Sequence, residues 1–261
     1  MTWIEALILG LIQGLTEFLP VSSSGHLEIG KVLLNVEVKE DLSFTVLVHF
    51  ATVLSTITVF FGELKELTRG LFAFRWNAET KYVSRILLSM IPVLIVGILF
   101  KDEVESLFSG NLKLVGVALL VTAALLISTQ LVKAGTKKIP FLDALIMGLA
   151  QAIAVIPGIS RSGATISAGL LMKNDRSEVA RFSFLMVLLP IIGAALLDIL
   201  SISSSNNEPG ISAGSLIIGF LAAYISGYLA CTWMIRLVKK GNLYWFAIYC
   251  SLVGLTAIIF S

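Results

Sequence analysis

Long apolar segments are the feature of this sequence that most restricts its fold. The hydrocarbon core of a bilayer is about 30 Å thick, and an α-helix needs about 20 mostly apolar residues to cross it. Six segments approach that length: Ser43–Phe61, Arg85–Phe100, Leu112–Val132, Ala180–Leu200, Ser212–Val238 and Leu243–Phe260. We therefore expect an all-α integral membrane protein, because a helix satisfies its own backbone hydrogen bonds inside lipid.

The composition agrees with this class. Charged residues make up 14% of the 261 residues and hydrophobic residues 57%, whereas soluble domains contain about 25% charged residues. The net charge of +2 gives no reason to expect a nucleic-acid partner. Cys231 and Cys250 both lie in apolar segments, so we expect small core residues rather than a disulfide or metal ligands.

Two other apolar segments, Trp3–Asn35 and Phe141–Lys173, are each interrupted by a polar stretch that contains proline and glycine. The interruptions are Leu19–His26 and Pro157–Thr165. Each half is short for a full span, and a broken backbone at membrane depth is tolerated only where protein buries it or water lines it. We predict that both segments form re-entrant hairpins, each with two short helices joined by a break.

The two interrupted segments resemble each other. Gly10–Gln13 corresponds to Gly148–Gln151 at an offset of 138 residues, and a Ser-Gly pair recurs in the breaks at the same offset. One hairpin followed by three spans ends on the opposite side, so the second copy must be inverted. We predict a single membrane domain over residues 1–261, with inverted repeats at about 1–135 and 140–261 whose hairpins meet near the midplane.

The basic residues predict the orientation of this topology. Of the 19 Lys and Arg residues, 14 fall in or beside the segments 62–84, 133–140, 173–181 and 236–242, which lie on one face, and 4 fall on the other face. Cytoplasmic loops carry the excess of Lys and Arg. We therefore expect a multi-pass protein of the cell inner (plasma) membrane, with both termini and the opening of the first hairpin on the external (periplasmic) side.

Two candidate functional residues precede the first break: Gln13 for substrate binding, and Glu17 for catalysis and metal binding. A charged side chain inside a membrane is costly and marks a functional site by default. The two residues are four apart and share a helix face. Glu17 could bind a metal, orient a histidine or accept a proton, and the alternative is a structural hydrogen bond at the break.

The polar residues of the first break favour a phosphate site. The chain continues after Pro20 with Ser22, Ser24 and Gly25 as candidate substrate-binding residues and with Ser23 and His26 as candidate catalytic residues. Free backbone N–H groups at the start of the following helix suit an anion. His26 could activate Ser23 or attack phosphorus itself. Plain helix capping by the serines is the alternative.

Arg161 is the main candidate of the second break, because its planar guanidinium matches phosphate oxygens. The candidate substrate-binding residues around it are Ser160, Ser162, Gly163 and Thr165. The two breaks together suit phosphoryl transfer, and the sequence contains neither a Walker-type loop nor a His/Cys cluster typical of zinc. Asp198, at the end of a span, and His49, as a supporting group, receive no role.

The two breaks resemble the signature motifs of a known family. The stretches Gln13–His26 and Pro157–Thr165 are similar to the motifs of undecaprenyl-diphosphatase, the bacitracin-resistance family, and the resemblance covers the whole chain. It implies hydrolysis of undecaprenyl diphosphate to undecaprenyl phosphate and inorganic phosphate. This reaction recycles the lipid carrier for peptidoglycan and other cell-wall polymers and confers bacitracin resistance. The expected partners are the polyprenyl diphosphate and the membrane, with a homodimer as an alternative to the monomer.

The resemblance also implies roles for individual residues. Ser23 is expected as nucleophile with His26 as its base, and direct attack by His26 is the alternative. Glu17 would orient His26 or bind a divalent cation, Mg²⁺ or Ca²⁺. Arg161 would neutralise charge on the transferred phosphoryl group. The family allows Glu or Gln where this chain has Gln13, so the metal role of that position is weaker here.

Three other functions compete with this one. A polyprenyl-phosphate transporter or flippase could use the same midplane site, as inverted repeats suggest. A second lipid-phosphatase superfamily shares a Ser-Gly-His and a Ser-Arg element, but it needs a histidine six residues after its arginine, where this chain has Ser167. A structural scaffold would leave Glu17, His26 and Arg161 in the membrane without a reason.

Overall fold

A computed structural model describes residues 1–34, 41–107, 111–133, 135–204 and 211–261, without the side chains of 41–43, 105 and 194–204. The regular structure of these residues is helical, apart from two isolated parallel bridges that join the segment after residue 134 to residues 174 and 175. The prediction of an all-α protein is confirmed for the part of the chain described.

Each of the six predicted spans corresponds to a helix: α3 (Asp41–Val59), α5 (Ala78–Leu99), α7 (Leu112–Ser128), α10 (Arg176–Ser204), α11 (Ala213–Lys240) and α12 (Tyr244–Ile259). Three helices are long and apolar enough to cross a membrane, namely α5, α11, and α7 with the short 3₁₀ turn η2 (Thr129–Leu131). The helix α4 (Phe61–Leu71) follows α3 after a bend of 76°, and the pair passes the same test together. These apolar helices are compatible with an integral membrane protein.

Each interrupted segment forms two helices, as predicted. The first contains α1 (Trp3–Phe18) and α2 (Ser23–Leu34), and the second contains α8 (Phe141–Ile153) and α9 (Arg161–Leu171). The first break is shorter than predicted, because α2 begins at Ser23, and the second lies earlier in the chain, because α8 ends at Ile153 and α9 begins at Arg161. The Ser160 hydroxyl accepts a hydrogen bond from Gly163 N at 3.0 Å and so caps α9. His26 therefore lies in the first turns of α2, and Ser162 to Thr165 in those of α9, rather than in irregular backbone.

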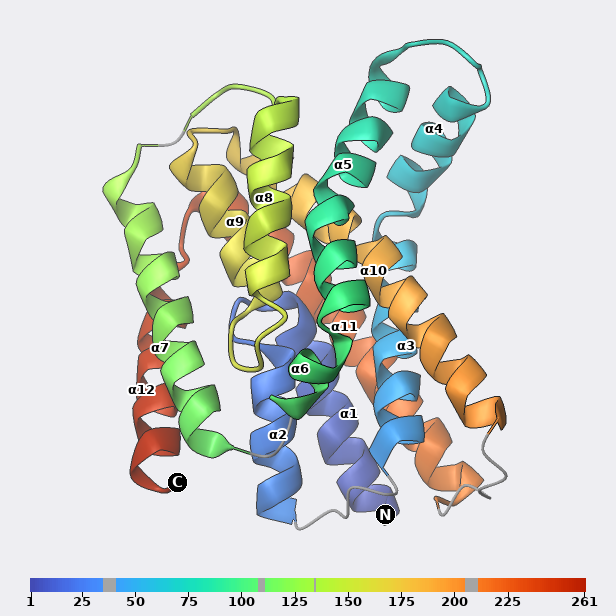
Figure 1. Ribbon diagram of the computed structural model, residues 1–261, viewed down its shortest axis with the longest axis vertical. Coiled ribbons are helices and arrows are strands. Elements are labelled where there is room, and N and C mark those ends of the chain that lie inside the picture. The colour runs from blue at the N-terminus through green and yellow to red at the C-terminus, as the bar shows by residue number, and fades with distance from the viewer. Residues whose placement is uncertain (35–40, 108–110, 134, 205–210) are drawn as a thin grey trace.

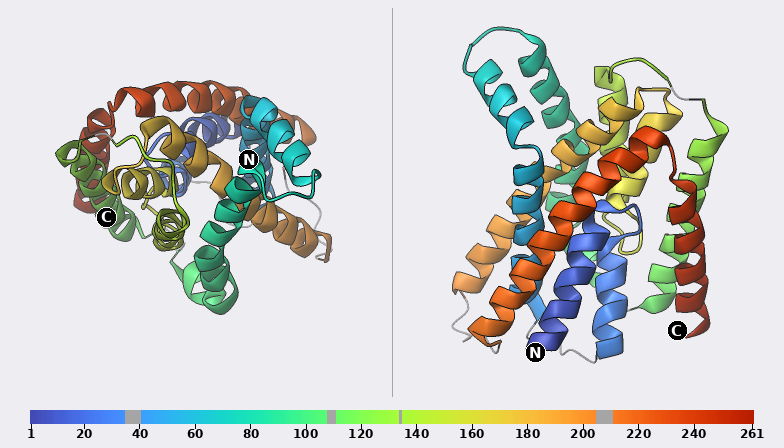
Figure 2. Two further views of the ribbon diagram at one scale, coloured as in Figure 1. Left: turned by 90° about the horizontal axis from the view of Figure 1, so that it is seen from above. Right: turned by 180° about the vertical axis from the view of Figure 1, so that it is seen from behind.

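The two hairpins occupy opposite halves of the molecule (Figure 1). The helices α1 and α2 lie in the lower half of the view, at the same end as both chain termini, whereas α8 and α9 lie in the upper half. The breaks between the paired helices meet in the middle, and the view from behind shows the same arrangement (Figure 2). The short helix α6 (Lys101–Ser106) connects α5 to the segment before α7.

Small residues allow α1 to pack closely against α11. A Cβ atom built on Gly10 would collide with the backbone oxygen of Gly219, and one on Gly14 would collide with the Ser226 hydroxyl. Gly148 of α8 faces the backbone of Ser89 in α5 in the same way. Such close approach increases van der Waals contact, which is a main source of helix association in lipid.

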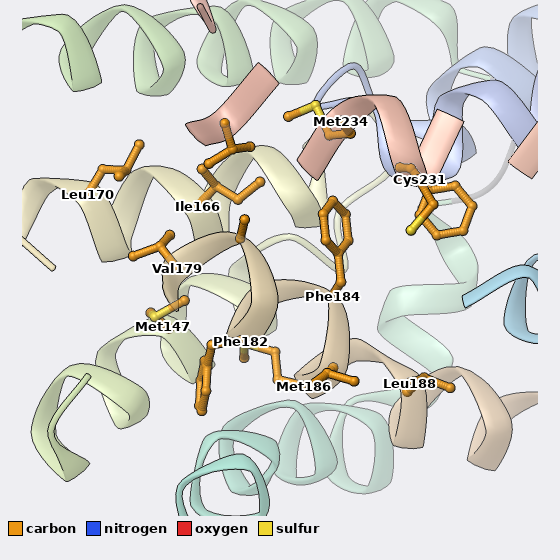
Figure 3. Packing of buried hydrophobic residues seen from close by; sticks show 14 of the residues in the cluster. Met147, Ile166, Leu170, Val179, Phe182, Phe184, Met186, Leu188, Cys231 and Met234 are labelled. Carbon is orange, nitrogen blue, oxygen red and sulfur yellow. The ribbon is translucent and has the colours of Figure 1, made fainter. Parts of the chain in front are cut away.

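The largest apolar cluster of the described residues extends over most helices, and one part of it packs between the second hairpin and α10 (Figure 3). Met147 of α8, Ile166 of α9 and Phe182 of α10 are fully buried there, and Phe184 joins them from the next part of α10. The packing fixes the position of α9, whose first residue is Arg161. The core therefore holds one side of the candidate site in place.

Candidate functional site

An ion pair joins the two hairpins. The Arg161 Nη2 group at the start of α9 donates a hydrogen bond to Glu17 Oε1 near the end of α1, with an N–O distance of 2.8 Å. The Glu17 side chain is 6% exposed and the Arg161 side chain 30% exposed. A nearly buried carboxylate is stable only with such partners, so the pair ties residues 144 positions apart into one site.

The second oxygen of Glu17 has two further donors. Ser23 Oγ donates to Glu17 Oε2 at 2.6 Å, and Gln13 Nε2 donates to the same oxygen at 2.9 Å. The predicted proximity of Gln13 and Glu17 on one helix face is confirmed. The three donors together fix the orientation of the carboxylate and bring a serine hydroxyl within reach of a proton acceptor.

His26 has partners other than Ser23. Its Nδ1 atom lies 2.8 Å from the carbonyl oxygen of Ser22, and its Nε2 atom lies 2.8 Å from the hydroxyl of Tyr249 in α12. The Ser23 hydroxyl is directed to Glu17 instead. The expected pair of Ser23 and His26 is therefore corrected: the ring of His26 turns towards Ser22 and α12, although Ser23 is three residues away on the same helix.

Ser22 shapes the first break. Its φ angle of 70° lies in the left-handed region, which costs non-glycine residues about 1–3 kcal/mol and is often found at functional sites. The Ser22 hydroxyl accepts a hydrogen bond from Gly25 N at 3.3 Å and lies 3.3 Å from Ser24 Oγ. Gly25 faces the second break, since a Cβ atom there would lie 3.1 Å from Gly158 Cα.

The second break is held by its own polar groups. Ser162 Oγ donates to the carbonyl oxygen of Leu19 at 3.3 Å, which links the two breaks a second time, and lies 3.2 Å from Ser160 Oγ. The Thr165 hydroxyl donates to Arg161 O at 2.8 Å and lies 2.6 Å from Ser183 Oγ. The structure thus gathers the predicted polar residues of both motifs around the ion pair.

Gly158 explains why the second break needs a glycine. Its φ angle is 96°, and a Cβ atom there would lie 2.6 Å from the backbone oxygen of Val115 in α7. Only glycine adopts this conformation without strain. The Gly158 carbonyl also accepts a hydrogen bond from Thr122 Oγ1 at 3.2 Å, so α7 supports the break directly.

A small cavity adjoins the ion pair. Its polar lining includes Glu17, Arg161, Thr52, Gln151 and Ser183. Gln151 is 1% exposed, and neither atom of its amide has a hydrogen-bond partner within the described residues. The sequence singled out Gln151 only as a marker of the repeat, and its place in the site follows from the packing of α8.

Few side chains at the candidate site could bind a metal ion. Within the described residues, no three His, Cys, Asp or Glu side chains lie together as a metal group. Glu17 is the carboxylate of the site, and within the described residues the buried Oε1 atoms of Gln13 and Gln151 have no hydrogen-bond partner. The donors available to a cation are therefore one carboxylate and two amide oxygens, which suits a hard cation that takes its remaining ligands from water or substrate.

The remaining residues singled out in the sequence are His49, Asp198 and the two cysteines. His49 is in α3, where its Nδ1 atom lies 2.8 Å from Thr45 O, and it is close enough to Glu17 and Arg161 for their charges to act on it. Asp198 is in the part of α10 whose side chains are outside the described residues. Cys231 and Cys250 are free and buried, as expected for core residues.

Comparison with known proteins identifies the family of the chain. The family model described as bacitracin resistance protein BacA matches residues 6–256. A protein of Parabacteroides distasonis named undecaprenyl-diphosphatase is 55% identical over 260 residues, covering 99% of this chain and 98% of the relative. Relatives with the same name from Bacteroides fragilis and Carboxydothermus hydrogenoformans are 55% and 38% identical, covering 100% and 98% of this chain and 99% and 96% of their own lengths. The family expected from the two motifs is thus confirmed, and the chain belongs to the bacitracin resistance protein BacA family.

Proposed function

We propose that this protein hydrolyses undecaprenyl diphosphate to undecaprenyl phosphate and inorganic phosphate, the reaction after which its relatives are named. The observation that carries the proposal is the hydrogen-bonded group of Ser23, Glu17 and Arg161 where the two breaks meet. It combines a nucleophile, a proton acceptor and a cationic fork in one place. The reaction recycles the lipid carrier of cell-wall polymers, which accounts for the bacitracin resistance in the family description.

In the proposed mechanism, Ser23 Oγ attacks the terminal phosphorus while its proton moves to Glu17 Oε2, 2.6 Å away. The bond from phosphorus to the bridging oxygen breaks, and undecaprenyl phosphate leaves as an anion that needs no proton. Water then attacks the phosphorus of the phosphoserine, the bond from phosphorus to Ser23 Oγ breaks, and Glu17 returns its proton to Ser23 Oγ. The second step thus releases inorganic phosphate and restores both side chains. Glu17 rather than His26 is the base in this scheme, because the Ser23 hydroxyl is bonded to Glu17.

Arg161 and the helix start of α2 would bind the phosphoryl oxygens. One donor of the Arg161 guanidinium is engaged by Glu17, and the guanidinium carries five donors in all. The free N–H groups at the start of α2, with the hydroxyls of Ser22 and Ser24, add donors for the same oxygens. Donors fixed in advance where negative charge develops are often the largest contribution to catalysis.

A divalent cation, Mg²⁺ or Ca²⁺, fits this site when substrate supplies most of the ligands. Glu17 and the unpartnered Oε1 atom of Gln13 would hold it. Mg²⁺ commonly binds through one or two carboxylates together with phosphate oxygens. Its chemistry would be to neutralise charge on the diphosphate.

We also propose that the chain is one membrane domain of two inverted repeats. The packing supports it, because α1 of the first half packs on α11 of the second, and the corresponding α8 packs on α5. The pairs α7 with α12 and α3 with α10 join corresponding helices of the two halves. A two-fold axis between the halves would produce both kinds of contact. It turns the pair α1 and α11 into the pair α8 and α5, and it places α7 and α3 against their own counterparts.

The proposed location is the cell inner membrane, with both termini and the opening of the site on the external side. The support is the charge distribution: the connections rich in Lys and Arg, such as those before α5 and before α8, lie at the end of the molecule away from the termini (Figure 1). Basic residues favour the cytoplasmic side.

The oligomeric state is a separate question. Light scattering of the purified protein distinguishes the monomer from the homodimer.

Phosphate release from a C55 polyprenyl diphosphate in detergent micelles tests the proposed function. We expect wild type to release one phosphate per lipid with Mg²⁺ or Ca²⁺ and to lose activity with a chelator. Ser23→Ala and Glu17→Gln should lower kcat at least about 10³-fold, as loss of a nucleophile or its base does in other enzymes. Glu66→Gln is the matched control, because Glu66 is an exposed carboxylate in α4, and it should keep wild-type activity.

Two results would contradict the proposal. A wild-type protein that binds the lipid but releases no phosphate under any metal condition favours the transporter alternative, because micelles offer no second compartment. Full activity of Ser23→Ala with loss in His26→Ala would assign the nucleophile to His26.

A further inference from the structure

His26 has a hydrogen-bond partner that lies outside both sequence motifs, the hydroxyl of Tyr249. Tyr249 lies in α12, and its hydroxyl oxygen is 2.8 Å from His26 Nε2, across 223 residues of sequence. The two rings are stacked, with centroids 5.5 Å apart and an angle of 13° between their planes. A hydrogen bond and a stacked ring together restrict both the direction and the rotation of an imidazole.

The two contacts of His26 define its tautomer. A backbone carbonyl oxygen only accepts hydrogen bonds, so the contact of Nδ1 with Ser22 O requires a proton on Nδ1. In the neutral ring Nε2 is then an acceptor, and the Tyr249 hydroxyl donates to it. A tyrosine hydroxyl can also accept, so the same contact persists when the ring is protonated.

The register of α12 on the first hairpin is fixed by a second contact. Cys250 Sγ, on the residue after Tyr249, donates to the carbonyl oxygen of Pro20 at 3.6 Å. Cys250 is fully buried, whereas Tyr249 is 43% exposed. Burial of the Tyr249 ring therefore contributes little to the core, and its hydroxyl is directed to the histidine of the motif.

We propose that Tyr249 is a positioning residue for His26, holding the imidazole with its proton on Nδ1 and Nε2 at the edge of the site. His26 then meets the lipid diphosphate in one orientation and one tautomer. The second half of the chain thereby orients a residue of the first motif, as Arg161 does for Glu17. The kinetic part of this inference rests on the proposed hydrolysis, while the tautomer of His26 does not.

Nitrogen NMR tests the pairing independently of activity. The chain has two histidines, so ¹⁵N-histidine spectra are simple, and His49→Asn identifies the signals of His26. At a pH where the ring is neutral, we expect wild type to carry the proton of His26 on Nδ1, with Nε2 as a hydrogen-bonded acceptor. A proton on Nε2 in wild type would overturn the proposal without any variant of Tyr249.

Kinetics of Tyr249→Phe tests the consequence, because this variant keeps the stacked ring and removes the hydroxyl. We expect kcat to fall about 3- to 10-fold, the effect of one net hydrogen bond, with KM nearly unchanged and the Nε2 signal of His26 moved to that of an acceptor without a hydrogen bond. Tyr244→Phe, the same change in the same helix beside Trp245, is the matched control and should behave as wild type.

The other outcomes are equally decisive. A Tyr249→Phe protein with wild-type kcat overturns the proposal, and so does one whose kcat falls while the Nε2 signal of His26 is unchanged. If wild type hydrolyses no diphosphate, the proposed function fails, and the wild-type and Tyr249→Phe spectra still decide the pairing. If Tyr249→Phe does not fold, the wild-type spectrum alone decides it.

Discussion

Glu17 is the residue on which the candidate site depends. One oxygen of its carboxylate pairs with Arg161, and the other accepts from Ser23 and Gln13. Breaking a buried ion pair by removing one partner leaves the other charge without compensation. The same carboxylate thus stabilises the contact between the hairpins and, in our proposal, accepts the proton of the nucleophile.

Arg161→Lys tests whether the shape of the guanidinium matters beyond its charge. We expect kcat to fall about 10- to 100-fold with little change in melting temperature, because an ammonium keeps the charge but not the planar set of donors. Phosphate release and thermal unfolding in detergent measure the two quantities. Arg236→Lys, at an exposed position of α11, is the control, and equal activity of both variants would show that charge alone suffices.

At the scale of elements, close helix contacts determine where each hairpin lies. Gly10 of α1 and Gly148 of α8 occupy corresponding positions, and both meet the backbone of a helix from the other half. A larger residue at either position would move the whole hairpin, and with it Glu17 or Arg161. Helix packing is therefore a direct condition for the geometry of the site.

Gly10→Ala should destabilise the protein. We expect the free energy of unfolding to fall by about 1–3 kcal/mol, because the added methyl group overpacks a contact with the backbone of Gly219. The melting temperature in detergent measures the change. Gly97→Ala in α5 has no atom within 4 Å of its new Cβ and should be neutral or stabilising; a loss equal to that of Gly10→Ala would refute the packing argument.

A buried polar group ties the second hairpin to its neighbouring segments. The Asp143 carboxylate, at the start of α8, accepts from Asn174 Nδ2 at 2.8 Å and pairs with Lys137 at 2.7 Å. We expect Asp143→Ala to lower the free energy of unfolding by about 1–3 kcal/mol, since it leaves the buried Asn174 without this partner. Denaturant or thermal unfolding checks it against Glu66→Ala, an exposed change in α4 that should have little effect.

At the scale of the whole molecule, the candidate site belongs to neither half alone. Glu17, Ser23 and His26 come from the first half, while Arg161 and Tyr249 come from the second. The apolar outer faces of the helices, such as that of α5, would contact lipid tails. A lipid substrate could then reach the site from within the bilayer, which gives a physical reason for placing this chemistry between membrane helices.

Cysteine labelling tests the proposed orientation. The two native cysteines are buried, so wild type should show little reaction with a membrane-impermeant maleimide. Ser261→Cys at the C-terminal end should react in cells whose external face is accessible, whereas Trp76→Cys in the exposed connection before α5 should react only in inside-out vesicles. The reverse pattern would invert the topology.

The local sequence was sufficient for the helices, the two interrupted segments and the family. Apolar length, together with proline and glycine at the breaks, dictates the helices and their interruptions through backbone chemistry that acts within a few neighbouring residues, and the two motifs indicated the family. The shift of the breaks arose because caps such as Ser160 extend a helix towards its start. The hydrogen bond that makes this cap is itself local, since it joins Ser160 to Gly163, three residues further along the chain.

The partners of the polar side chains were decided only by the tertiary structure. Sequence proximity suggested His26 as the partner of Ser23, but packing directs Ser23 to Glu17 and His26 to Tyr249. Tyr249 carries no local signal of a role, and Gln151 carries only its match to Gln13 in the repeat, because both reach the site only when α12 and α8 dock on the other half of the chain. A hydrogen bond between distant residues depends on the relative position of whole helices, and that position is set by the sum of their packing contacts.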